Sequence, residues 1–317
     1  MLKDRILFTL RFFDLQDTPL TLFELHKFLL AGQEELKNNL DEQREAKDLP
    51  DNQAASAVSA GEILTCLETE CAGETESRDG FYALCGRTHL VSQRLENYQY
   101  GIKREKFIRR FISGMRHVPF VRGVGLVGSQ PLGLQKKDSD IDLLILVETD
   151  FLWLARFFVT AYFQLLGRRR HGKKIADRFC LNHYVAEGKY LTFDRNLYTA
   201  AEYLKMRPLV YADKLQKFLG ANCRWIKPLF PHAVFSPPKN NKPSFVQNLA
   251  ERLLKSKLGL WLERQSRNLQ KRRLNIGEFI IASDDELSFH PNNRKKQLFQ
   301  KFFETKTSEI DESYAKV

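Results

Sequence analysis

The stretch that most constrains the fold is residues 125–147, GLVGSQPLGLQKKDSDIDLLILV. An apolar segment ends at Gly128-Ser129, a short polar turn follows, and a second apolar segment begins with the alternating acids Asp140 and Asp142. A period of two places both acids on one face of a strand. Leu143 to Val147 are apolar on both faces, which predicts an internal strand of a sheet.

The acid pair restricts the chemistry of this turn. Two neighbouring carboxylates repel by roughly 1 kcal/mol in water and roughly 4 kcal/mol at a protein-like dielectric. The pair is costly unless a cation or a shared proton relieves it, and Mg²⁺ bound together with nucleotide phosphates is the common solution. Gly128 lets a ligand approach the backbone and Ser129 adds a hydroxyl, so the turn could hold phosphates. The alternative is an Asp-rich turn with no ligand.

This arrangement resembles the DNA polymerase β-like nucleotidyltransferase superfamily, whose signature is Gly-Ser, a gap, and Asp-x-Asp in the second strand. The match consists of Gly128-Ser129 and the SDID sequence of residues 139–142, and the resemblance covers about residues 98–215. It implies a mixed sheet flanked by helices, with a helix before the Gly-Ser strand. It also implies an NTP substrate, in-line transfer of a nucleoside monophosphate, and Mg²⁺, or Mn²⁺ in its place.

The resemblance assigns roles to individual residues. Asp140 and Asp142 would be catalytic and bind the metal. The nucleotide-binding residues would be Gly128, Ser129, Lys137 and Ser139.

A third carboxylate usually comes from a later strand of this fold, and the sequence departs from that pattern. The candidate strand, residues 178–185, contains no acid. Asn182 stands where the acid is expected and is our candidate for the third catalytic position, while Asp177 lies just before the strand. Asn can ligate a metal weakly but cannot take a proton from a hydroxyl. Three alternatives stay open: Asp177 reaches in, the substrate is activated differently, or the enzyme is weak or inactive.

Periodicity and turn residues predict an α/β and α multi-domain chain with three parts. Residues 1–95 read as a winged-helix-like domain, with two helices before residue 30, a flexible insertion at about 32–60, a helix at 61–71, a turn at 73–79 and a strand at 80–84. Thr21 and Glu24 have the spacing of a capping box at the second helix.

Residues 96–234 form the nucleotidyltransferase domain in this interpretation. It begins within a helix at 91–116 and continues with strands at 121–127, 140–148 and 178–186, a helix at 150–166, and a helical region to about 219. Residues 235–317 read as a linker (235–243) and a helical basic C-terminal region, with an amphipathic helix at 244–275, an apolar stretch at 279–281 and a helix near 294–303.

Charge is distributed unevenly along the chain, whose formal net charge is +11. Residues 1–100 contain 10 Lys+Arg against 18 Asp+Glu, a net of −8, which leaves 40 against 21, a net of +19, for the rest. A basic body favours a phosphate-bearing partner, and nucleic acid could bind through the basic regions. The dense basic loop at 167–174 could hold a triphosphate or an RNA backbone, or be a solvated surface loop.

The remaining composition indicates a soluble, cytoplasmic protein that does not enter a membrane. The five cysteines match neither a zinc site nor a disulfide framework, so reduced thiols in a cytosol are the simplest account. Residues 1–15 lack the apolar centre of a signal peptide. The most apolar run, residues 151–166, is short for a membrane span and contains Arg156.

Two functions from different classes follow. The first is a metal-dependent nucleotidyltransferase with an unknown acceptor: an RNA end, a protein hydroxyl, as in a toxin–antitoxin pair, or a small molecule. The second is a nucleic-acid-binding or regulatory protein that retains a degenerate, inactive nucleotidyltransferase fold.

Overall fold

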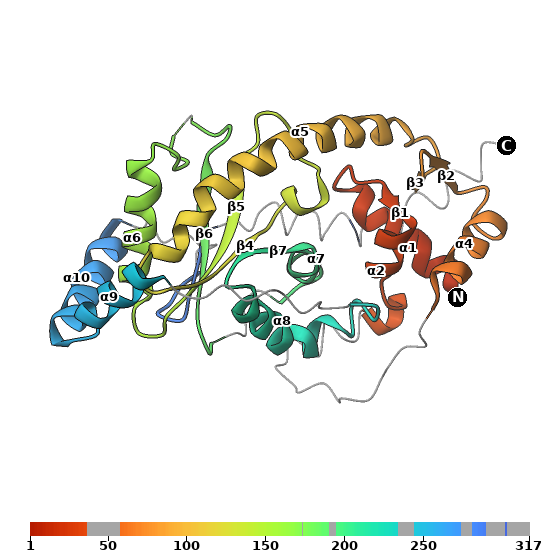
Figure 1. Cartoon of the computed structure of the whole chain (residues 1–317). Coiled ribbons are helices and arrows are strands. Elements are labelled where there is room, and N and C mark those ends of the chain that lie inside the picture. The colour runs from red at the N-terminus through yellow and green to blue at the C-terminus, as the bar shows by residue number, and fades with distance from the viewer. Residues whose placement is uncertain are drawn as a thin grey trace.

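The computed structural model describes residues 1–36, 58–172, 174–189, 195–233, 244–273, 281–289 and Phe302. It has a six-stranded mixed sheet, ordered β7-β4-β5-β6-β9-β8, with helices on both sides, and a three-stranded sheet near the N-terminus (Figure 1). The expectation of a mixed sheet flanked by helices is therefore confirmed. None of the helices in these residues is both long and apolar enough to cross a membrane.

The centre of the large sheet is built from β4 (Val121–Leu126), β5 (Ile141–Val147) and β6 (Phe179–Ala186). β5 pairs antiparallel with β4 and parallel with β6, so it is internal as predicted. Its side chains alternate between two hydrophobic cores, with Leu144 and Leu146 on one face and Ile141 and Ile145 on the other. Burial on both faces explains the unbroken apolar run in the sequence.

Helices cover both faces of this sheet. α5 (His89–Ile112) and α6 (Leu152–Leu165) supply Ile108 and Phe163 to the core on one face, and α7 (Leu197–Lys205) and α8 (Ala212–Ile226) cover the other. The predicted helix at 91–116 ends earlier than expected, because its last turn tightens into the 3-10 helix η1 (Ser113–His117) before Pro119.

Three strands of the large sheet were not predicted. The expected helical region to about residue 219 is interrupted by β7 (Arg207–Val210), which pairs with β4. Pro208 explains the interruption, because proline removes a helical hydrogen bond and clashes with the preceding turn. β8 (Ile281–Ala282) and β9 (Glu286–Ser288) extend the sheet beyond β6. Both are too short for a periodic signal, and residues 279 and 280 lie outside the described part.

The N-terminal part contains helices, a small sheet and one confirmed capping box. Its elements are α1 (Leu2–Asp14), β1 (Leu20–Thr21), α2 (Leu22–Lys27), α4 (Ala60–Thr69), β2 (Thr75–Arg78) and β3 (Phe81–Leu84). The Thr21 hydroxyl accepts from the backbone of Glu24, whose carboxylate accepts from the backbone of Thr21. The prediction of a turn at 73–79 is wrong, because this segment contains the strand β2. The polar side chains of β2 gave no strand signal in the sequence. Most of the expected insertion, residues 37–57, lies outside the described residues.

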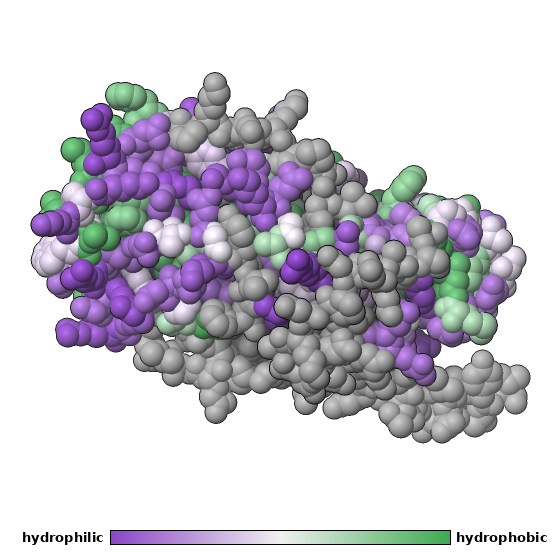
Figure 2. Space-filling model, turned by 90° about the horizontal axis from the view of Figure 1, so that it is seen from below, coloured by the Kyte–Doolittle hydropathy of each residue, from purple (hydrophilic) through white to green (hydrophobic). Residues whose placement is uncertain are grey.

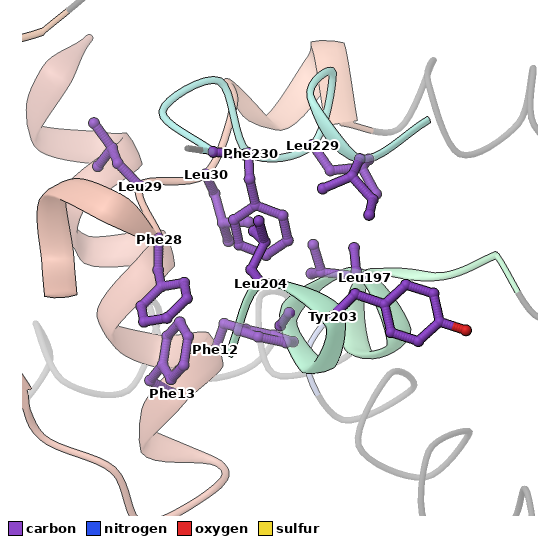
Figure 3. Packing of buried hydrophobic residues seen from close by; sticks show 14 of the residues in the cluster. Phe12, Phe13, Phe28, Leu29, Leu30, Leu197, Tyr203, Leu204, Leu229 and Phe230 are labelled. Carbon is purple, nitrogen blue, oxygen red and sulfur yellow. The ribbon is translucent and has the colours of Figure 1, made fainter. Parts of the chain in front are cut away.

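The N-terminal helices share a core with the six-stranded sheet. Phe12, Phe13 and Phe28 from α1 and the end of α2 lie against Leu204 of α7 and Phe230 beyond α8 (Figure 3). α5 also runs from the N-terminal helices to the sheet (Figure 1), so the predicted boundary between residues 95 and 96 falls inside a continuous helix.

The C-terminal basic segment forms two helices, α9 (Phe245–Leu254) and α10 (Lys257–Arg273), rather than the predicted single helix at 244–275. Lys255 and Ser256 interrupt it. Leu249, Leu253 and Trp261, expected on one apolar face, are each at least half exposed. The end of the molecule that carries these helices shows mainly hydrophilic residues with small apolar patches between them (Figure 2). The predicted linker and the helix near 294–303, except Phe302, fall outside the described residues.

Candidate active site

The Gly-Ser turn lies directly against one of the two acids. Val127 donates its backbone N–H to the carbonyl of Asp142 at 3.1 Å, which extends the β4–β5 ladder up to the turn. Gly128 follows with a φ of +75°, and a Cβ on it would lie 2.8 Å from Oδ2 of Asp142. Only glycine meets both the left-handed backbone and the close approach. The neighbouring Ser129 side chain is exposed beside this contact.

Asp140 and Asp142 converge on one side of the sheet. Asp140 precedes β5 and Asp142 is its second residue. One carboxylate oxygen of each and the sulfur of Cys180 all lie within 4.8 Å of one another. Cys180 stands opposite Asp142 in the parallel β5–β6 register. The three residues form a candidate site for a divalent metal ion.

The surroundings of Asp142 disfavour its ionised form. Burial, the charge of Asp140 and the charge of Glu202 on α7 raise the pKa of Asp142 to about 7, against a hydrogen bond from Cys180 and the charge of Arg170. The sequence alternation predicted the repulsion between the two acids. The contribution of Glu202 could not be seen, because it comes from a helix sixty residues farther along the chain.

Arg170 supplies a positive charge at the acid pair. Its Nη1 donates to Oδ2 of Asp140 and lies 3.3 Å from the sulfur of Cys180. This guanidinium belongs to the basic loop at 167–174, so the loop reaches the acids directly. A cationic group already contacts two of the three candidate ligands, which shows that the position attracts positive charge.

On β6, Cys180 is the residue that lies beside the two acids. A bulge in the β5–β6 register pairs Asp142 with Cys180 and Leu144 with His183, so Asn182 lies at the irregularity. Asp177 turns toward α5, where it forms an ion pair with Nε of Arg104 at 2.6 Å. Burial and the two acids raise the pKa of the Cys180 thiol. A protonated thiol is a poor ligand for a hard cation.

The other predicted nucleotide-binding residues have different surroundings. Ser139 donates its hydroxyl to the carbonyl of Lys136 at 2.8 Å and accepts from Arg104 at 3.2 Å, so it shapes the turn. Lys137 is exposed. Sequence reasoning missed Gln130, which is 4% exposed and whose side-chain amide has no hydrogen-bond partner among the described residues. A buried amide without a partner is unusual, and this one directly follows Ser129 in the turn.

The comparisons with known proteins agree with this geometry. Residues 108–177 match the family model of the nucleotidyltransferase domain. This segment contains Gly128-Ser129, both acids, and the basic loop with Arg170. No curated protein and no solved structure matches the chain.

Proposed function

We propose that this chain, whose residues 108–177 match the family model of the nucleotidyltransferase domain, is a metal-dependent enzyme that transfers a nucleoside monophosphate from an NTP to an acceptor. The observation that carries the proposal is the convergence of Asp140 and Asp142 within 4.8 Å against the Gly128 turn. Two carboxylates this close are costly even beside Arg170, and a divalent cation would relieve their repulsion.

The residues present fit Mg²⁺, or Mn²⁺ in its place, through the two carboxylates. Asp140 and Asp142 would hold the ion, while water and NTP oxygens complete its coordination, as Mg²⁺ prefers. The bound ion would stabilise negative charge on the attacking and leaving oxygens. Gly128 and Ser129 would contact the triphosphate, and the exposed Lys137 would add charge at its edge.

The reaction would be an in-line displacement. The acceptor hydroxyl oxygen forms a bond to the α-phosphorus, the bond from that phosphorus to the oxygen shared with the β-phosphate breaks, and pyrophosphate leaves. The hydroxyl proton passes to water. Asn182 would orient groups at the third position without taking that proton, because an amide is not a base at neutral pH.

Radiolabel transfer tests this proposal directly. The full chain is incubated with Mg²⁺ and NTP labelled at the α-phosphate, alone and with total cellular RNA or protein, and label in macromolecules is counted. We expect Asp140→Asn and Asp142→Asn to reduce incorporation to background. The control Asp138→Asn changes an exposed acid of the same loop and should leave incorporation intact.

The opposite outcome favours the second function. The position opposite Asp142 holds Cys180 and not an acid, which suits a degenerate site. Equal labelling by wild type and both aspartate variants would remove the enzymatic proposal and leave a binding or regulatory protein.

A further inference from the structure

The basic loop at 167–174 is fixed at its base. The backbone N–H groups of Arg168 and Arg169 donate to the carbonyl of Phe163, and Phe179 donates to the carbonyl of Arg168 at 2.8 Å. The guanidinium of Arg168 also stacks over the ring of Phe107 on α5, 4.9 Å from its centre. These contacts hold residues 168 and 169 along the start of β6.

A cavity of about 360 Å³ opens beside this loop. Gln164 and Gly167 form part of its lining. The rest consists of four basic side chains, Arg169, His171, Lys174 and Arg178. Within the described part of the chain, none of the four forms an ion pair. The nearest acids in sequence are engaged elsewhere, Asp177 with Arg104 and Asp140 with Arg170. Arg169, Lys174 and Arg178, charged and without an ion-pair partner in the described part of the chain, surround a cavity of ligand size and indicate an anionic ligand.

The cavity lies on the opposite side of the acids from the Gly-Ser turn. The turn follows β4, the acids lie at the start of β5, and Arg169 forms a bridge with Phe179 on the far side of β6. With strands spaced about 4.8 Å apart, the loop lies roughly 14 Å from the β4 end of the site. An NTP triphosphate held at the turn is too short to fill the cavity as well. Arg170, between two cavity-lining residues, connects the cavity to Asp140.

We propose that this cavity binds the phosphodiester backbone of a single-stranded nucleic-acid acceptor, whose terminal hydroxyl then reaches the acids past Arg170. The proposal rests on the proposed function and specifies its acceptor. A polyanion can contact Arg170 and the cavity at once, because successive phosphates repeat along the strand. A neutral or cationic small-molecule acceptor would not match four unpaired basic side chains.

Binding without catalysis provides the test. A fluorescently labelled single-stranded oligoribonucleotide is titrated with the full chain in EDTA, without NTP, and anisotropy is measured over a salt series. The first variant combines Arg169→Gln, Lys174→Gln and Arg178→Gln. The second combines His171→Ala and Lys174→Gln, which changes only exposed residues and keeps the half-buried arginines. The matched control combines Lys257→Gln, Arg272→Gln and Arg273→Gln at exposed positions of α10.

We expect the triple cavity variant to bind the strand at least about tenfold more weakly, with the slope of log affinity against log salt reduced by about 2, since each phosphate contact contributes roughly 0.7 on single strands. The exposed double variant should weaken binding in the same direction, and the α10 control should bind like wild type. Absent binding by wild type, or equal losses in the cavity variants and the control, would overturn the proposal.

A separate titration with a non-hydrolysable NTP and Mg²⁺ distinguishes the two proposals. If the cavity variants lose NTP binding and keep strand binding, the cavity holds the triphosphate and the acceptor assignment is wrong. If Asp140→Asn abolishes labelling while the strand fails to bind, the enzymatic function stands and only this inference falls.

Discussion

Gly128→Ala tests whether the turn and Asp142 form one site. Alanine at the observed φ of +75° costs about 1–2 kcal/mol of folding free energy through the left-handed backbone. Its Cβ would also lie 2.8 Å from Oδ2 of Asp142. Carbon–oxygen contacts normally lie at about 3.3–3.6 Å, so the carboxylate must move by roughly 0.5 Å or more.

That displacement is large on the scale of catalysis. Catalytic groups need positions accurate to about 0.5 Å, and a misplacement of about 1 Å can reduce the rate on the order of 100-fold. We therefore expect Gly128→Ala to lower label transfer by roughly ten- to a hundredfold and to weaken Mn²⁺ binding. Urea unfolding should show a stability loss larger than the backbone contribution alone.

Gly86→Ala provides the matched control. Gly86 has a φ of +76°, and a Cβ there would meet no atom within 4 Å. It should lose about 1–2 kcal/mol of stability and keep full transfer and metal binding. Indistinguishable stability, metal binding and transfer in the two variants would refute the contact between turn and acid.

Two further substitutions address charges around the site and in the core. Arg170→Gln removes the guanidinium that donates to Asp140 and would compete with a metal ion for that carboxylate. Loss of one charge-assisted hydrogen bond should tighten Mn²⁺ binding without NTP about tenfold. Unchanged or weaker Mn²⁺ binding in calorimetry would contradict this expectation. Lys205→Met replaces a buried lysine. Burial lowers the pKa of Lys205 from 10.5 to about 8, and the charge of Glu202 offsets only part of this shift. Between these values the unfolded chain binds more protons, so wild-type stability should rise with pH there, by up to about 3 kcal/mol in total. The variant should be more stable than wild type at pH 7 and show no such rise in urea unfolding, and a parallel rise in both proteins would exclude Lys205 as its source.

The sequence predicted the parts of the site that depend on local order along the chain. Alternation placed Asp140 and Asp142 together, and apolar residues on both faces predicted the internal position of β5. The glycine at 128 signalled a close approach, and the structure shows that the approaching group is Asp142 itself. These signals are local because strand periodicity and turn conformation act over a few residues.

The parts that sequence reasoning missed depend on pairing between distant segments. Cys180 lies opposite Asp142 in the parallel register, and a bulge follows at Leu181 and Asn182. A single-residue irregularity changes which side chain faces the site, and no composition or spacing within one strand reveals it. The contact from Arg170 likewise requires the loop to lie along β6, which depends on the hydrogen bonds to Phe163 and Phe179.

The hydrophobic core that α1, α2 and α7 share joins the N-terminal helices to the helix that carries Glu202. α7 carries both Glu202, which acts on Asp142, and Leu204, which packs with the N-terminal helices. Removing those helices would leave Leu204, Phe218 and Phe230 facing water and loosen the helix that shapes the charge of the site. A change in the packing of the N-terminal helices is therefore expected to move α7 and, through Glu202, to alter the pKa of Asp142.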